Sequence, residues 1–264
     1  MSNNPPNKTE QTKPSEMVDQ KTINRRTFIS FLVFIISSIA AYFGWKWLYH
    51  SPLEPKGITA DARQPLRKVM DANAKVFKQA LGPNTMANTY PKTQATKSPR
   101  VNGTEGLASA DLSNWTFQVV KSATETLNLT LDDIKALPKT EIVYDFKCIE
   151  GWEMITHWGG VKFSDFIKHY QLEPQTELQY IGLHTPDKQY YVGIDMPSAM
   201  HSQTMLCYEL NGQPLSLKHG APLRLIIPVK YGIKNLKRIG TLFFSNERPP
   251  DYWAENGYDY FSGL

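Results

Sequence analysis

Two stretches of the sequence decide which fold and which chemistry are to be expected: Asp145-Phe-Lys-Cys148-Ile-Glu150-Gly151-Trp152, and a later run from His219 to Lys237. The first stretch ends an apolar-alternating segment with a lone cysteine, directly before a glycine and a tryptophan. The second contains a short apolar strand, residues 223–228, between loops that carry several cations. A thiol and a group of cations are typical of a soft-metal ligand and of an anion site.

Composition limits the class of protein. The chain has 264 residues, of which 41% are hydrophobic, so it can bury one large core with a small appendage. Its net charge of +4 is too small to indicate nucleic-acid binding, and no nucleic-acid partner is expected. Residues 211–240 nevertheless contain six cations and no acidic residue: Lys218, Arg224, Lys230, Lys234, Lys237 and Arg238. Such a block is usually a solvated face, but its glycines and prolines are also typical of a phosphate site.

The two cysteines, Cys148 and Cys207, exclude a disulfide-rich scaffold and have no zinc-binding spacing. A single bridge between them would suit an oxidising compartment, and the sequence leaves that alternative open. Cys207 lies within the apolar pattern Met205-Leu-Cys-Tyr208 and is expected to be a buried structural residue.

The N-terminal region predicts export from the cytoplasm. Residues 1–26 are polar, are expected to be disordered, and end in the pair Arg25-Arg26. Paired arginines before an apolar stretch are similar to a twin-arginine signal, a route that carries folded proteins.

The apolar residues 27–49 follow, and a stretch of roughly 20 such residues can cross a bilayer. Trp45, Trp47 and Tyr49 resemble an interfacial aromatic belt at its end. We therefore expect one uncleaved anchor that holds the globular part at the periplasmic face of the cytoplasmic membrane. The alternative is cleavage after Ala40, which would release a soluble periplasmic protein.

Residues 50–100 are expected to form a linker. Apolar residues recur at helical spacing between positions 62 and 81, and Gly82-Pro83 ends the pattern. We expect this amphipathic helix to pack on the globular domain rather than on a membrane surface. Residues 84–99 are long enough to form a strap across that domain.

Residues 101–264 predict an α+β domain of short strands and few helices. Alternating patterns predict strands at 115–120, 141–148, 179–184, 189–193, 204–210, 223–228 and 240–245. Asn211-Gly212 is a strong hairpin-turn signal. Thr130 is a suitable N-cap for a helix over 131–136, and a second helix is expected over 164–170.

The motifs resemble those of molybdopterin-dependent oxidoreductases of the sulfite oxidase fold. Cys148-Ile-Glu150-Gly-Trp152 is similar to the cysteine loop of that family, and residues 211–215, 220–228 and 230–234 are similar to its cofactor-binding region. Within the family, the likeness is nearest to exported enzymes that reduce protein-bound methionine sulfoxide. The resemblance implies a sulfite oxidase-type domain, a molybdenum–molybdopterin cofactor, and oxygen-atom transfer as the reaction.

The resemblance also implies a role for each matching residue. Cys148 would be the thiolate ligand of molybdenum, a soft metal. Arg224 would bind the cofactor phosphate, together with the backbone and lysine of Asn235, Leu236 and Lys237. His219 and Thr185 match further cofactor contacts, although Thr185 fits a plain strand-end turn equally well.

On the open side of the metal we expect Tyr231 and Glu150, with His157 and Trp158 as further candidates. For the last two, packing in the loop after Trp152 is the stronger alternative. Glu150 stands where sulfite-oxidising relatives carry arginines, and its carboxylate would repel an anionic substrate. We therefore expect reduction of a neutral S- or N-oxide. Sulfite oxidation and a non-catalytic binding module are the alternatives.

Two features differ from the family pattern. Residues 100–106 replace the aromatic and asparagine-rich strap of the sulfoxide reductases, so the substrate pocket is expected to differ there. No CxxCH haem motif occurs, and electrons are expected from a separate membrane or periplasmic partner. Lys230 and Lys234 are expected either as cofactor contacts or as surface charges.

Overall fold

A computed structural model describes residues 20–54, 62–81, 85–101, 103–107 and 112–264. It divides into two compact units between Ser51 and Pro52. The described residues of the first unit form one helix, α1 (Gln20–His50), in which no residue is buried. By length and composition α1 can cross a membrane, although an N-terminal signal sequence has the same properties.

The start of α1 differs from the expected disorder of residues 1–26. The helix begins at Gln20, so the Arg25-Arg26 pair is helical. The Gln20 side chain donates a hydrogen bond to Asn24 Oδ1 across one turn, at 3.1 Å, which supports this early start. Residues 1–19 lie outside the described part of the chain.

The second unit starts with helix α2 (Gln64–Leu81), close to the expected range. The expectation that its apolar face packs on the domain is wrong for the side chains that are described. Leu66, Val69, Met70 and Val76 are 49%, 58%, 44% and 61% exposed. The periodicity of the sequence identifies the apolar face, but it does not say what covers that face.

The predicted strap is present in residues 85–101. Ala87 exchanges two hydrogen bonds with the Gln203 side chain, Tyr90 N–H donates to the Val143 carbonyl, and Thr96 N–H donates to the Ile155 carbonyl. The strap contains one 3-10 turn, η1 (Lys92–Gln94).

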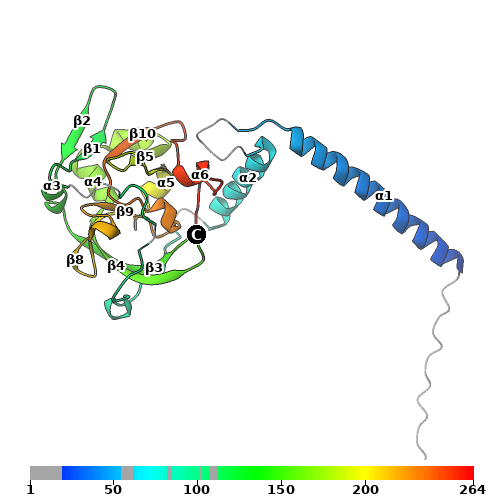
Figure 1. The fold of residues 1–264 in the computed structure, drawn as a ribbon, viewed down its shortest axis with the longest axis horizontal. Coiled ribbons are helices and arrows are strands. Elements are labelled where there is room, and N and C mark those ends of the chain that lie inside the picture. Colours follow the sequence, from blue (N-terminus) through cyan, green and yellow to red (C-terminus); the bar gives the residue numbers. More distant parts are fainter. Residues whose placement is uncertain (1–19, 55–61, 82–84, 102, 108–111) are drawn as a thin grey trace, which may run out of the picture. The chain divides into compact units, whose positions relative to one another are not determined.

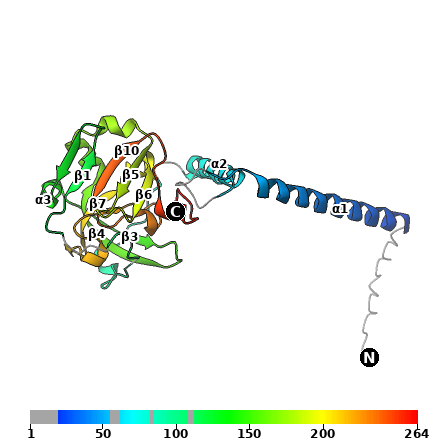
Figure 2. The same ribbon diagram turned by 45° about the horizontal axis from the view of Figure 1, so that its top comes forward.

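The domain contains two five-stranded sheets (Figures 1 and 2). The first has the order β2-β1-β10-β5-β6, and only its β1–β10 pair is parallel. Its strands are β1 (Phe117–Val120), β2 (Thr126–Leu129), β5 (Tyr180–His184), β6 (Tyr191–Asp195) and β10 (Thr241–Ser245).

The second sheet has the order β3-β4-β7-β8, and β9 also pairs with β7. Its strands are β3 (Thr140–Lys147), β4 (Glu153–Lys162), β7 (Met205–Leu210), β8 (Gln213–Pro214) and β9 (Arg224–Ile226). Strand β4 corrects the expected loop after Trp152. The predicted hairpin turn is confirmed, because Asn211 and Gly212 both have positive φ, at 53° and 70°, between β7 and β8.

Short helices connect the strands. The predicted cap of α3 (Leu131–Lys135) is a full capping box between Thr130 and Asp133. The other helices are α4 (Phe163–His169), α5 (Met196–Ala199), α6 (Tyr252–Glu255), η2 (Glu173–Glu177), η3 (Leu217–His219) and η4 (Gly232–Lys234). The α+β prediction is therefore confirmed.

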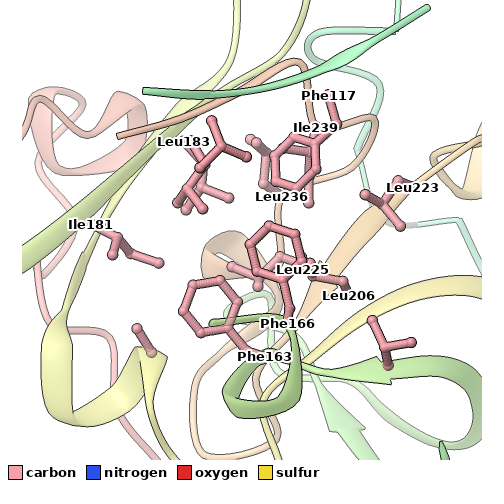
Figure 3. Packing of buried hydrophobic residues seen from close by; sticks show 14 of the residues in the cluster. Phe117, Phe163, Phe166, Ile181, Leu183, Leu206, Leu223, Leu225, Leu236 and Ile239 are labelled. Carbon is pink, nitrogen blue, oxygen red and sulfur yellow. The ribbon is translucent and has the colours of Figure 1, made fainter. Parts of the chain in front are cut away.

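The main core lies between the two sheets (Figure 3). Phe117 and Ile181 come from the first sheet, Leu206 and Leu225 from the second, and Phe166 from α4, and each is at most 1% exposed. Strand β7 is buried on both faces, because Leu206 faces this core while Cys207 belongs to a second apolar cluster. Because apolar clusters pack against both faces of β7, the second sheet and the loops at its ends are fixed in position.

Candidate active site

Cys148 lies directly after β3 in a tight turn. Its N–H donates to the Trp152 carbonyl at 2.9 Å, and Gly151 N–H donates to the Cys148 carbonyl at 3.0 Å. Gly151 has φ of 86°, a conformation that favours glycine. Burial raises the pKa of the Cys148 thiol, which is 6% exposed. Both Cys148 and Cys207 are free thiols, so the structure does not contain the bridge left open by the sequence.

Cys148 lines a pocket built from segments that are far apart in the sequence. Residues just after the strap, the cysteine loop, the residue before β6, the 232–237 loop and the C-terminal region all contribute to its wall. The lining residues are Gly103, Glu105, Cys148, Ile149, Glu150, Tyr190, Gly232, Ile233, Asn235, Lys237, Trp253 and Tyr258. The fold thus brings the cysteine loop together with part of the cationic loop, which we define as residues 230–237, as the sequence predicted.

Asn235 lines the pocket, but its side chain also organises the cationic loop. Its Oδ1 accepts from Ile227 N–H at 2.6 Å, and its Nδ2 donates to the Tyr231 carbonyl at 3.0 Å. Across the pocket, the Tyr190 hydroxyl donates to the Ile233 carbonyl at 2.5 Å. These bonds fix the loop backbone at the pocket wall.

Two cations of this loop are buried in ion pairs with acidic residues from elsewhere in the domain. Lys230 Nζ donates to Asp195 Oδ1 at 2.8 Å, and Lys234 Nζ donates to Asp251 Oδ2. Both lysine side chains are 1% exposed. The expectation that they are surface charges is therefore wrong. Their role in the structure is to attach the loop to β6 and to the start of α6.

Arg224 and Lys237 differ from these lysines because neither has a carboxylate partner among the described residues. Lys237 Nζ donates to the Gly103 carbonyl at 2.8 Å. The Arg224 guanidinium donates to the carbonyls of His219, at 2.9 Å, and Asn235, at 3.2 Å, while its buried Nε has no partner in the described part of the chain. It also lies 4.5 Å from the centroid of the Trp158 ring.

Because neither Lys237 nor Arg224 has a carboxylate partner among the described residues, the cost of burying their charges is not compensated. Burial, and then the charge of Arg224, lower the pKa of Lys237 to about 7. Burial likewise lowers the pKa of Arg224 to about 10. A buried cation is costly unless a negative charge accompanies it. The two side chains therefore form a site prepared for an anion next to Cys148, with Arg224 acting through its charge since it does not line the pocket.

Glu150 is paired with the strap. Its Oε2 accepts from Trp152 Nε1 at 2.8 Å and lies 3.9 Å from Arg100 Nη2. The Arg100 guanidinium lies 4.8 Å from the centroid of the Trp152 ring. Arg100 is thus a cation at the pocket that the motif comparison in the sequence did not identify, and it partly compensates the Glu150 charge.

The other predicted residues surround the pocket without lining it. Leu236 is fully buried in the main core. His219 binds the Ser216 hydroxyl through Nδ1 and the Pro99 carbonyl through Nε2, at 2.8 and 3.3 Å. Thr185 is 1% exposed and closes a turn with Tyr190, which agrees with the alternative of a plain strand-end turn. Tyr231 N–H donates to the Ser262 carbonyl at 3.0 Å.

His157 and Trp158 are buried on strand β4, and neither lines the pocket. His157 Nε2 lies 3.3 Å from Glu141 Oε1, while the Trp158 ring lies against Arg224. Packing is therefore their role in this structure, but in a strand and not in a loop.

Sequence reasoning missed the aromatic part of the pocket wall, which consists of Tyr190, Trp253 and Tyr258. Trp253 lies in the C-terminal region, where the sequence analysis identified no site residue. Trp253 lines the same pocket as Cys148 although more than a hundred residues separate the two in the sequence. No local sequence pattern predicts that they meet there.

Comparison with known proteins decides the family. The model of the oxidoreductase molybdopterin binding domain matches residues 105–253, more than half of the chain. The chain belongs to this family. The match includes Cys148, the cationic loop and Trp253, and it confirms the resemblance to molybdopterin-dependent oxidoreductases.

Several curated relatives are similar over a large part of the chain. A protein-methionine-sulfoxide reductase subunit by name (YedZ1), from Azospira oryzae, is 34% identical over 69% of each chain. The protein-methionine-sulfoxide reductase catalytic subunit MsrP of Ralstonia nicotianae is 36% identical over 51% of this chain and 45% of its own. MsrP of Xanthomonas axonopodis is 32% identical over 58% and 52%. The chain thus spans about half the length of these MsrP relatives.

Among solved structures, the sulfane dehydrogenase SoxCD of Paracoccus pantotrophus superposes with a TM-score of 0.48 and 17% identity. The match covers 63% of this chain and 46% of that one. A likeness of this size is partial.

The residues of the pocket fit the cofactor of the family. A phosphate group would supply the negative charge that Lys237 and Arg224 lack: Lys237 lines the pocket and would donate to it, and Arg224 would contribute through its charge alone. The Cys148 thiol lines the same pocket and is a ligand suited to a soft metal. Thiol and cations therefore match the two ends of a phosphate-bearing metal cofactor.

Proposed function

We propose that this protein is a molybdenum-cofactor oxidoreductase that reduces a sulfoxide-type substrate outside the cytoplasm. The family membership gives the oxidoreductase class, and the pocket that joins Cys148 to Lys237 is the observation that carries the proposal. The relatives named as protein-methionine-sulfoxide reductases support the choice of substrate. In this reaction the sulfoxide accepts two electrons and two protons and releases one water molecule.

Each residue of the site has a separate task in this proposal. Cys148 binds the metal through its thiolate, Lys237 and Arg224 hold the anionic end of the cofactor, and Asn235 keeps the loop backbone in position. Asn235 and Lys237 line the pocket and would contact the cofactor, Leu236 would hold this stretch in the core, and His219 and Thr185 support the neighbouring backbone. When bound, the molybdenum cofactor supplies the two-electron redox chemistry and the oxygen-atom exchange.

The pocket wall suits a neutral thioether oxide. Tyr190, Trp253 and Tyr258 offer aromatic surface to methyl and methylene groups, and sulfur makes favourable contacts with aromatic rings. Glu150 disfavours an anion. Sulfite oxidation is the second candidate function, because Arg100 lies close enough to offset the Glu150 charge.

The proposed location is supported by α1. It is long and apolar enough to span a bilayer, and the Arg25-Arg26 pair lies near its start. The proposal is a single anchor that holds the domain at the periplasmic face, where a separate membrane or periplasmic partner supplies electrons.

The test is substrate profiling of the cofactor-loaded full chain with artificial electron donors and acceptors. Methionine sulfoxide should be reduced faster than sulfite is oxidised, and Cys148→Ser should lower turnover more than about a hundredfold, because even indirect partners of metal ligands cost 10–100-fold. Cys207→Ser is the matched control, since Cys207 is fully buried in apolar surroundings away from the pocket. A folded wild-type protein that binds neither molybdenum nor pterin would contradict the proposal and favour a binding module.

A further inference from the structure

Helix α2 exposes an apolar face that the domain does not cover. Val69 and Met70 follow Leu66 by three and four residues, and Val76 follows Val69 by seven, so the four share one side of the helix, and each is 44–61% exposed. A contiguous apolar surface of this kind marks an interaction site with a protein or a membrane.

The polar side of α2 is the side that contacts the domain. Arg67 Nη1 lies 3.7 Å from Asp259 Oδ1, and Asp71 Oδ1 accepts from Arg248 Nη2 at 3.3 Å. These residues lie about a third of a turn or more away from the apolar side, given 3.6 residues per turn. The ion pairs therefore turn the apolar side chains away from the domain.

The start of α2 is tied to the chain immediately after α1. Gln64 N–H donates to the Pro52 carbonyl, and Glu54 N–H donates to the Ala62 carbonyl, both at 2.9 Å. Leu53 and Arg63 form a β-bridge between these bonds. Because α1 ends at His50, only Ser51 separates it from Pro52 in the chain. The start of α2 is therefore attached to the chain two positions after the end of α1.

We propose that α2 lies in the membrane interface, with Leu66, Val69, Met70 and Val76 facing the acyl chains. This inference rests on the proposed membrane anchor. Amphipathic helices that lie in the interface combine an apolar face with basic residues on the polar face. Lys68 and Lys75 are exposed on α2 and can meet anionic headgroups.

A photoreactive phenylalanine analogue tests this placement. It is introduced at Val69, on the apolar side, and separately at Lys75, on the polar side, in the cofactor-loaded full chain in vesicles of phosphatidylethanolamine and phosphatidylglycerol. Both sites are exposed and neither residue lines the Cys148 pocket, so turnover should be unchanged. Irradiation should give lipid adducts at least about fivefold more often at position 69 than at position 75.

Equal or absent lipid adducts at the two positions would overturn the proposal. Protein adducts from position 69 in native membranes, without lipid adducts in vesicles, would overturn it in favour of a protein partner. Alkaline carbonate extraction of the same vesicles reports on α1 alone. Protein that resists extraction but gives no lipid adduct at position 69 would leave the anchor intact and remove only the role of α2.

Discussion

The segment from His219 to Lys237 contains two kinds of buried cation, and the contrast between them locates the site. Lys230 and Lys234 lie in ion pairs with Asp195 and Asp251. Lys237 and Arg224 are buried to a similar degree but bind only carbonyl oxygens among the described residues. Identical charges from one stretch of sequence thus serve two purposes. The paired cations stabilise the conformation of the loop, and the uncompensated cations form a site for an anion.

The largest expected effect comes from breaking a paired cation. Lys234→Met would leave Asp251 charged and buried, so the free energy of unfolding should fall by about 3–5 kcal/mol in urea denaturation. Asp251→Asn keeps the acceptor that caps α6 and, combined with Lys234→Met, should recover part of that loss. A loss below about 1 kcal/mol would mean that Lys234 does not hold the loop.

The matched change in an uncompensated cation should have the opposite profile. Lys237→Met removes a buried charge without a carboxylate partner, so stability of the cofactor-free protein should stay constant or rise. Its cofactor affinity should fall by about tenfold or more, because a hydrogen bond to a charged group contributes about 1.5–3 kcal/mol. Pterin and molybdenum per folded protein measure this, and full retention of both would contradict the anion site.

The pH dependence sharpens the contrast. The folded-state pKa of Lys237 is about 7, below its ordinary value of 10.5. Between these values the unfolded chain binds more protons, so Lys237 contributes stability that rises with pH. In cofactor-free protein, the unfolding free energy of wild type relative to Lys237→Met should therefore increase from pH 7 to about pH 10. A difference that stays constant over this window would show that Lys237 is not desolvated.

The smallest effect concerns the exposed pair at the pocket. Arg100→Gln should raise the KM of an anionic sulfoxide relative to a neutral one, and Glu150→Gln should lower it. Each change should be about threefold, the size expected for one charge roughly 6 Å away in a water-like dielectric. The double variant should return to the wild-type ratio. Single variants with unchanged ratios would show that this pair does not influence substrate charge.

Local patterns predicted most strands and the cysteine turn, because each depends on neighbours in the sequence. Strand β4 was missed because Gly159 and Gly160 interrupt its pattern at a register shift. A Cβ atom on Gly160 would lie 2.1 Å from the Leu206 carbonyl oxygen, so the close approach of β7 explains that glycine. This requirement is visible only once the strands are paired.

The site was predicted only in part for a related reason. Cys148 and Lys237 could be identified from motifs, and the structure brings them to one pocket. The pairing of Lys230 and Lys234 could not, because Asp195 and Asp251 are distant in the sequence. For α2, the pattern of apolar residues located a face, while the orientation of that face depends on ion pairs of Arg67 and Asp71.

The most direct test of the central claim, that this pocket binds molybdenum through Cys148, is the molybdenum K-edge absorption spectrum of the loaded full chain. Cys148→Ser should remove one sulfur ligand from the metal shell, whereas Cys207→Ser should leave the shell unchanged. An identical sulfur shell in wild type and Cys148→Ser would contradict the claim.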